Sequence, residues 1–95
     1  MNAKELGILF EEDDAFAAGV KVRLRWTNSG RQFCGLGTIT RLNAKSLRAT
    51  LDHEVGSPSE PFGYYPASYE IIVPRITDPK KWTANNCARL AINEG

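Results

Sequence analysis

Residues 20–26 alternate strictly between apolar and basic side chains. The apolar members are Val20, Val22, Leu24 and Trp26, and the residues between them are Lys21, Arg23 and Arg25. A period of two is typical of a half-buried β-strand, because successive side chains point to opposite faces. The pattern therefore predicts a strand with its apolar side in the core and its basic side in water.

Three further segments have strand-like patterns, at residues 31–42, 46–52 and 69–73. Turn-forming residues at 27–30 and 43–45 separate the first of them from its neighbours. Gly35 and Gly37 lie inside the predicted strand 31–42, which indicates a bulge or a close approach of two backbones. Residues 53–63 are rich in glycine and proline and are predicted to form a loop.

The two ends of the chain are expected to carry short helical turns. Residues 3–11 are predicted to form one short helix, with Asn2 as its cap and Leu6, Leu9 and Phe10 on one face. Residues 77–79 carry a helix-start signal, with proline at the first helical position. A single turn over residues 80–82 would follow, and residues 88–92 are expected to close the sheet as a last strand.

Short strands joined by tight turns, with glycine at the bends, predict a mainly β protein that forms a small closed or nearly closed barrel. Its length of 95 residues corresponds to one domain. Within it we expect an acidic N-terminal appendage at residues 1–15, a barrel core at 16–76, and a C-terminal turn with a closing strand at 77–95.

Part of the chain resembles the KOW pattern of SH3-like barrels, which occurs in ribosomal proteins and transcription elongation factors. The resemblance covers about residues 16–52 and is carried by Phe16, Gly19, Val20, Val22, the run Gly35-Leu36-Gly37-Thr38-Ile39, and Leu42. It implies a five-stranded SH3-like barrel with a binding role. Nucleic acid and nucleoprotein are the partners that it implies.

Charge is distributed unevenly, although the net charge is only +1. Residues 20–50 contain seven basic residues and no acidic one, whereas residues 1–19 and 51–95 are both net acidic. The start of the chain lacks the pattern of a signal peptide, and no apolar run approaches the length of a membrane span. We therefore expect a cytoplasmic protein without a membrane partner, in which Cys34 and Cys87 stay reduced.

The basic segment is the first candidate site. Its predicted nucleic-acid-binding residues are Lys21, Arg23, Arg25, Arg41 and Arg48. Like charges side by side on a sheet repel one another, and phosphate groups would neutralise them with release of counterions. The alternative is a solvated face that is neutralised by the acidic run at residues 11–14. If that run competes with an anionic ligand, deleting residues 1–14 should tighten binding.

Aromatic residues supply a second candidate site, with Tyr64, Tyr65, Lys81 and Trp82 as partner-binding residues. Exposed rings there would stack on bases or anchor a peptide. The alternative is that these aromatic side chains form a lid on the barrel. The second functional hypothesis is therefore a protein-interaction adaptor, encoded by a virus or another mobile element, which uses these anchors.

Catalytic chemistry is poorly supplied, so we expect a binding module rather than an enzyme. His53 is the only histidine, and its sequence neighbours Asp52 and Glu54 would point to the opposite face of a strand from His53, so the three do not converge as ligands. A Cys34–His53 nucleophile pair would require the fold to bring the two together. The ligand set is too small for zinc, and no phosphate-binding loop is present, so no metal or cofactor is expected.

Overall fold

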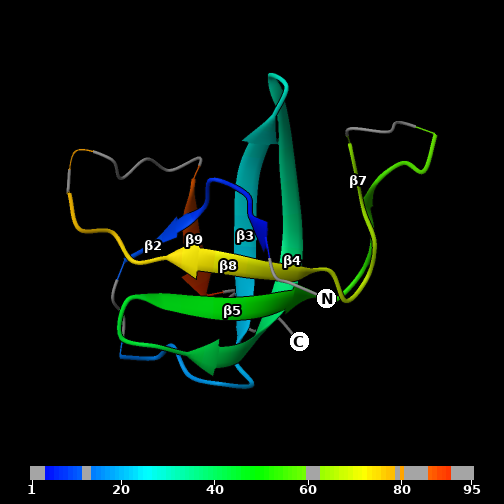
Figure 1. Cartoon of the computed structure of the whole chain (residues 1–95). Coiled ribbons are helices and arrows are strands. Elements are labelled where there is room, and N and C mark those ends of the chain that lie inside the picture. Colours follow the sequence, from blue (N-terminus) through cyan, green and yellow to red (C-terminus); the bar gives the residue numbers. More distant parts are fainter. Residues whose placement is uncertain (1–3, 12–13, 60–62, 79, 81–85, 91–95) are drawn as a thin grey trace.

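The computed structural model describes residues 4–11, 14–59, 63–78, 80 and 86–90, and these form a mainly β protein around a curled sheet (Figure 1). The strands are β1 (Lys4–Glu5), β2 (Leu9–Phe10), β3 (Lys21–Asn28), β4 (Arg31–Leu42), β5 (Ser46–Leu51), β6 (Val55–Gly56), β7 (Tyr64–Tyr65), β8 (Glu70–Pro74) and β9 (Cys87–Leu90). Seven of them form one sheet in the order β1-β8-β5-β4-β3-β9-β2, and β6 pairs with β7.

The predicted central strands are confirmed. β3 and β4 form an antiparallel hairpin in continuous register from Lys21↔Thr38 to Asn28↔Arg31. Ser29 and Gly30 both have positive φ, at 54° and 78°, so they form the tight turn that the turn-rich sequence predicts. β5 then pairs with β4, and β8 pairs with β5.

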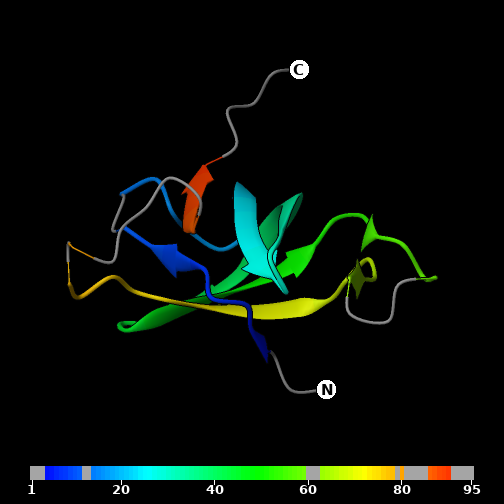
Figure 2. The same cartoon turned by 90° about the horizontal axis from the view of Figure 1, so that it is seen from above.

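The long strand β4 takes part in both layers of the sheet (Figures 1 and 2). β5 and β8 cross in front of β3 and β9, and β4 connects the two layers. A close backbone approach at Gly37 is confirmed, because a Cβ there would lie 2.9 Å from the Thr50 carbonyl oxygen. The register shift lies further along, between Ile39 and Arg41. Glycine at position 37 thus allows β4 and β5 to pack closely. The register shift follows just after β4 ends its pairing with β3 at Thr38.

The predicted N-terminal helix is wrong. Residues 4–5 pair with β8 and residues 9–10 pair with β9, both in parallel, so this segment lies along both edges of the five central strands. Gly7 separates the two pairs with a φ of 76°, which helical residues do not adopt. Ile8 and Phe10 are 0% and 4% exposed. These two side chains therefore belong to the hydrophobic core.

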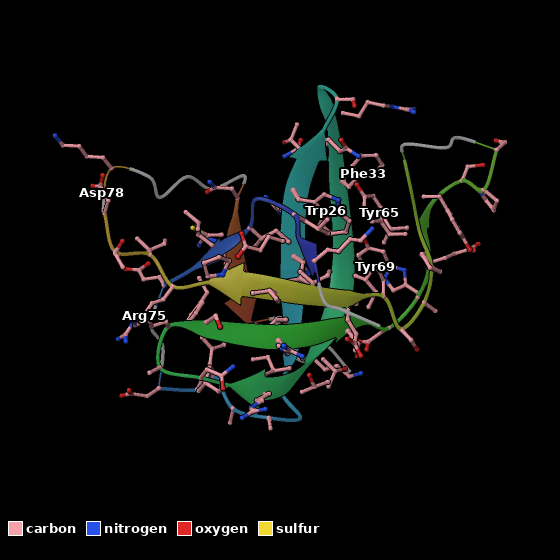
Figure 3. The ribbon with its side chains drawn as sticks, in the orientation of Figure 1. Trp26, Phe33, Tyr65, Tyr69, Arg75 and Asp78 are labelled. Atoms are coloured by element: carbon pink, nitrogen blue, oxygen red, sulfur yellow. The ribbon has the colours of Figure 1, made fainter. Side chains whose placement is uncertain are left out.

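The predicted loop at residues 53–63 is wrong in part, because it contains strand β6. β6 and β7 form a small hairpin in which Gly56 lies opposite Tyr64. Two-residue strands show no periodicity that a sequence pattern can reveal. The hairpin brings Tyr65 over Trp26 and Phe33, with ring centroids 5.1 Å and 5.4 Å away, and Tyr69 packs against Tyr65 at 5.5 Å (Figure 3).

The C-terminal strand is confirmed as β9, which pairs antiparallel with β3. The described residues contain no α-helix. Most of the predicted turn at residues 80–82 lies outside the described residues, and so does the end of the predicted last strand. Just before the predicted turn, the Asp78 side chain accepts a hydrogen bond from the Lys80 main-chain N–H at 3.0 Å.

Candidate nucleic-acid interface

β3 presents its basic residues on the outside of the sheet, as the alternation predicts. Val22 and Leu24 are fully buried and Trp26 is 1% exposed. Lys21 and Arg23 are exposed between them, and Arg25 is half-buried. Because the apolar side chains of β3 fill the core, the alternating basic side chains point to the outer face of the sheet.

The register adds a basic residue that the sequence analysis missed. Arg89 on β9 lies directly opposite Arg23 on β3, and it is exposed. A closing strand at this end of the chain was predicted, but its register was not. The sequence alone therefore could not show that the arginine on this strand lies beside the basic residues of β3.

A second pair of arginines lies further along the same outer face. Arg41 on β4 and Arg48 on β5 are opposite one another in register, just after the shift between Ile39 and Arg41, and both are exposed. Two arginines directly opposite each other destabilise a sheet. Such a pair occurs twice here, at Arg23↔Arg89 and at Arg41↔Arg48.

In the register of the sheet, these basic residues lie in successive rows on its outer side. Going down β3, Arg25 comes first, then Arg23 beside Arg89, then Lys21 in register with Thr38 and Thr50, and Arg41 with Arg48 follows. We call these six basic residues the basic track. Among the described residues, no carboxylate forms an ion pair with Arg23, Arg25, Arg41 or Arg48.

Lys21 differs from the other members of the basic track because it is paired. Its Nζ lies 2.9 Å from Asp52 Oδ2 and donates to Thr38 Oγ1 at 2.8 Å. The Thr38 hydroxyl in turn donates to Asp52 Oδ1 at 2.7 Å. Partial burial acts to raise the pKa of Asp52, but hydrogen bonds from Thr38 and Lys21 and the charge of Lys21 outweigh it and hold that pKa below 3.8.

This lowered pKa predicts a small acid-sensitive contribution to stability. The pair stabilises the fold fully above pH 3.8, and its contribution is lost as the pH falls through the lower pKa of the folded state. Because the Lys21 side chain is 61% exposed, we expect Asp52→Asn to lower the unfolding free energy at pH 7 by only about 0.5–1 kcal/mol. Urea unfolding at pH 7 and at pH 3 measures this, and the difference between wild type and variant should shrink at the lower pH.

No family model, curated protein or solved structure matches this chain. The described residues contain no group of three or more metal-ligating side chains, and none of their segments is a helix that is long and apolar enough to cross a membrane.

Of the predicted partner-binding residues Tyr64, Tyr65, Lys81 and Trp82, the structure describes the two tyrosines, and neither is a fully exposed anchor. Tyr65 is 6% exposed, and its hydroxyl accepts a hydrogen bond from Asn28 Nδ2 at 2.9 Å. Its ring therefore has no free face for a base or a peptide. Tyr64 is half-buried and donates to Glu54 at 3.2 Å; burial and this carboxylate raise the pKa of Tyr64 above 10.0. Lys81 and Trp82 lie outside the described residues.

Cys34 and His53 are not arranged as a nucleophile and its base. His53 Nε2 accepts from the main-chain N–H of Leu36 at 3.3 Å, and Nδ1 lies 2.9 Å from the carbonyl oxygen of Glu54. Both ring nitrogens are thus directed at main-chain groups rather than at the thiol. Cys34 is exposed and Cys87 is buried, and both are free thiols.

Proposed function

We propose that this chain is a non-enzymatic binding module, built as a small SH3-like barrel, that engages nucleic acid or a nucleoprotein through the basic track. One observation carries the proposal: on one outer face, two pairs of arginines lie in opposed register. Arg23, Arg41 and Arg48 have no carboxylate partner among the described residues. Like charges placed in this way lower stability, and a row of phosphates would neutralise them.

Phosphate contacts are favoured over base stacking as the main source of affinity. The rings of Trp26, Phe33 and Tyr65 are buried in the aromatic cluster, so they are not available for stacking. The guanidinium groups of the basic track match the geometry of phosphate oxygens, to which they can donate two hydrogen bonds at once. Affinity that comes from phosphates depends strongly on salt and little on sequence.

The alternative of a protein-interaction adaptor loses one of its anchors, because the Tyr65 ring is packed inside the fold. Lys81 and Trp82 lie outside the described residues. The charge arrangement therefore supports the nucleic-acid proposal better than the aromatic residues support the adaptor.

The salt dependence of binding tests the proposal. If about three to four phosphates are neutralised, log K should fall against log salt with a slope near −3 on duplex DNA. Fluorescence anisotropy of a short labelled duplex, titrated between about 50 and 200 mM salt, measures the slope. The double variant Arg23→Gln/Arg89→Gln should make it shallower by about 2, because two phosphate contacts are lost.

A matched control removes two positive charges elsewhere. Lys4→Gln/Lys80→Gln changes exposed lysines that lie outside the basic track and leaves the net charge equal to that of the arginine variant. Its slope should stay close to that of the wild type. A flat salt response of the wild type, or equal losses in both variants, would argue against the proposal.

A further inference from the structure

Lys21 occupies the middle of the basic track. It lies in the row between the Arg23↔Arg89 pair and the Arg41↔Arg48 pair, in register with Thr38 and, through it, with Thr50. A polyanion that follows the outer side of the sheet from one arginine pair to the other therefore crosses the row of Lys21. The charge at this point affects any ligand that spans the track.

A closed hydrogen-bonded network holds the Lys21 ammonium on its own molecule. Two of its three N–H groups point to Thr38 Oγ1 and Asp52 Oδ2, at 2.8 and 2.9 Å. The second oxygen of Asp52 is bound by the Thr38 hydroxyl at 2.7 Å, and the Asp52 main-chain N–H donates to the Leu36 carbonyl oxygen at 2.9 Å. The carboxylate is thus fixed by three strands or strand ends, and it is negative at neutral pH.

The network is not required to hold the strands together. β3, β4 and β5 are already joined by main-chain pairing and by a buried face that includes Leu24, Ile39 and Leu51. An exposed ion pair of this kind contributes about 0–1 kcal/mol to stability. Asp52 does, however, place a negative charge where a phosphate oxygen would otherwise meet Lys21, and like charges at such a site repel.

We infer that Asp52 is an intramolecular competitor for the basic track, which withholds Lys21 from a nucleic-acid phosphate and so limits affinity. This inference rests on the proposed function. It names the carboxylate that weakens binding, and this carboxylate lies at the end of β5 rather than in the acidic run at residues 11–14. The wild-type chain then binds through its arginines alone.

The test compares Asp52→Asn with Glu70→Gln, which also removes one negative charge. Glu70 lies in the same row of the sheet, opposite Thr50, but it forms no ion pair with Lys21. Freeing Lys21 adds one phosphate contact, so Asp52→Asn should bind duplex DNA about eightfold more tightly at 0.1 M salt, with a slope steeper by about 0.9. Glu70→Gln should change affinity by less than about twofold.

A double variant separates the competition from a general charge effect. Lys21→Gln should cancel the gain in the Asp52→Asn background, because the freed ammonium of Lys21 is the source of that gain. Equal gains in Asp52→Asn and Glu70→Gln, or a wild-type slope retained by Asp52→Asn, would overturn the inference while leaving the proposed function intact. A wild-type chain that binds no DNA would instead remove the proposed function itself.

Discussion

Replacing Ile8 and Phe10 together by alanine is expected to unfold the domain at room temperature. The two side chains are 0% and 4% exposed, and they belong to the same core cluster as Leu24 and Ile71. Each large-to-alanine change in a core costs about 2–5 kcal/mol. Together the two changes cost about 4–10 kcal/mol, which matches the lower part of the roughly 5–15 kcal/mol that holds a typical domain folded, where a domain of this size is expected to lie. Circular dichroism and urea unfolding of the full-length variant measure the loss.

A control on the same segment keeps this prediction specific. Lys4→Ala changes an exposed residue of β1 and should alter stability by no more than about 0.5 kcal/mol. A double variant that still unfolds cooperatively, within about 1 kcal/mol of the wild type, would contradict the role given to the N-terminal segment.

The same reasoning changes how the acidic run at residues 11–14 should be tested, since deletion of residues 1–14 also removes Ile8 and Phe10 from the core. Neutral amide substitutions in that run avoid the loss.

The central strands were predictable because their signal is local. Between residues 20 and 52, a period of two and turn-forming residues at the right intervals define β3, β4 and β5 with little error. The N-terminal segment gives no such signal. Its two-residue pairings with β8 and β9 are parallel and join residues far apart in the chain, so the apolar spacing of Leu6, Leu9 and Phe10 was interpreted as one face of a helix.

The candidate site was predictable only as far as it depends on a single strand. Alternation alone places Lys21, Arg23 and Arg25 outside. The pairing of Arg23 with Arg89 depends on the register of β9, and the pairing of Arg41 with Arg48 depends on an irregularity in β4. Neither has a local signature.

The acid that pairs with Lys21 likewise had no signal in the sequence. The run at residues 11–14 was the obvious intramolecular partner of the basic face because four acids are adjacent in the chain. The structure pairs Lys21 with Asp52, which follows Leu51 on the outer face of the sheet, and residues 12–13 of the acidic run lie outside the described residues. Proximity through strand pairing, rather than local charge density, decides which carboxylate meets which lysine.

The two arginine pairs predict an unusual combination of effects. Removing a residue that stabilises a fold lowers its unfolding free energy. Arg23, Arg41 and Arg48 lie opposite other arginines, and no carboxylate among the described residues compensates them. Removing the repulsion should therefore leave the fold as stable as before, or make it more stable, while it removes the contacts that bind a polyanion.

The quadruple variant Arg23→Gln/Arg41→Gln/Arg48→Gln/Arg89→Gln should lose affinity for duplex DNA by about 10³-fold at 0.1 M salt, because three to four phosphate contacts are lost. Its unfolding free energy should rise by up to about 0.5 kcal/mol, since the repulsion between Arg41 and Arg48 is relieved. Anisotropy and urea unfolding on the same preparation measure the two effects. Arg25→Gln is the control for stability, because Arg25 lies opposite Cys34 rather than another arginine and its removal relieves no pair. A quadruple variant that loses both stability and binding would show that these arginines serve the fold, and the nucleic-acid proposal would then have no support from their placement.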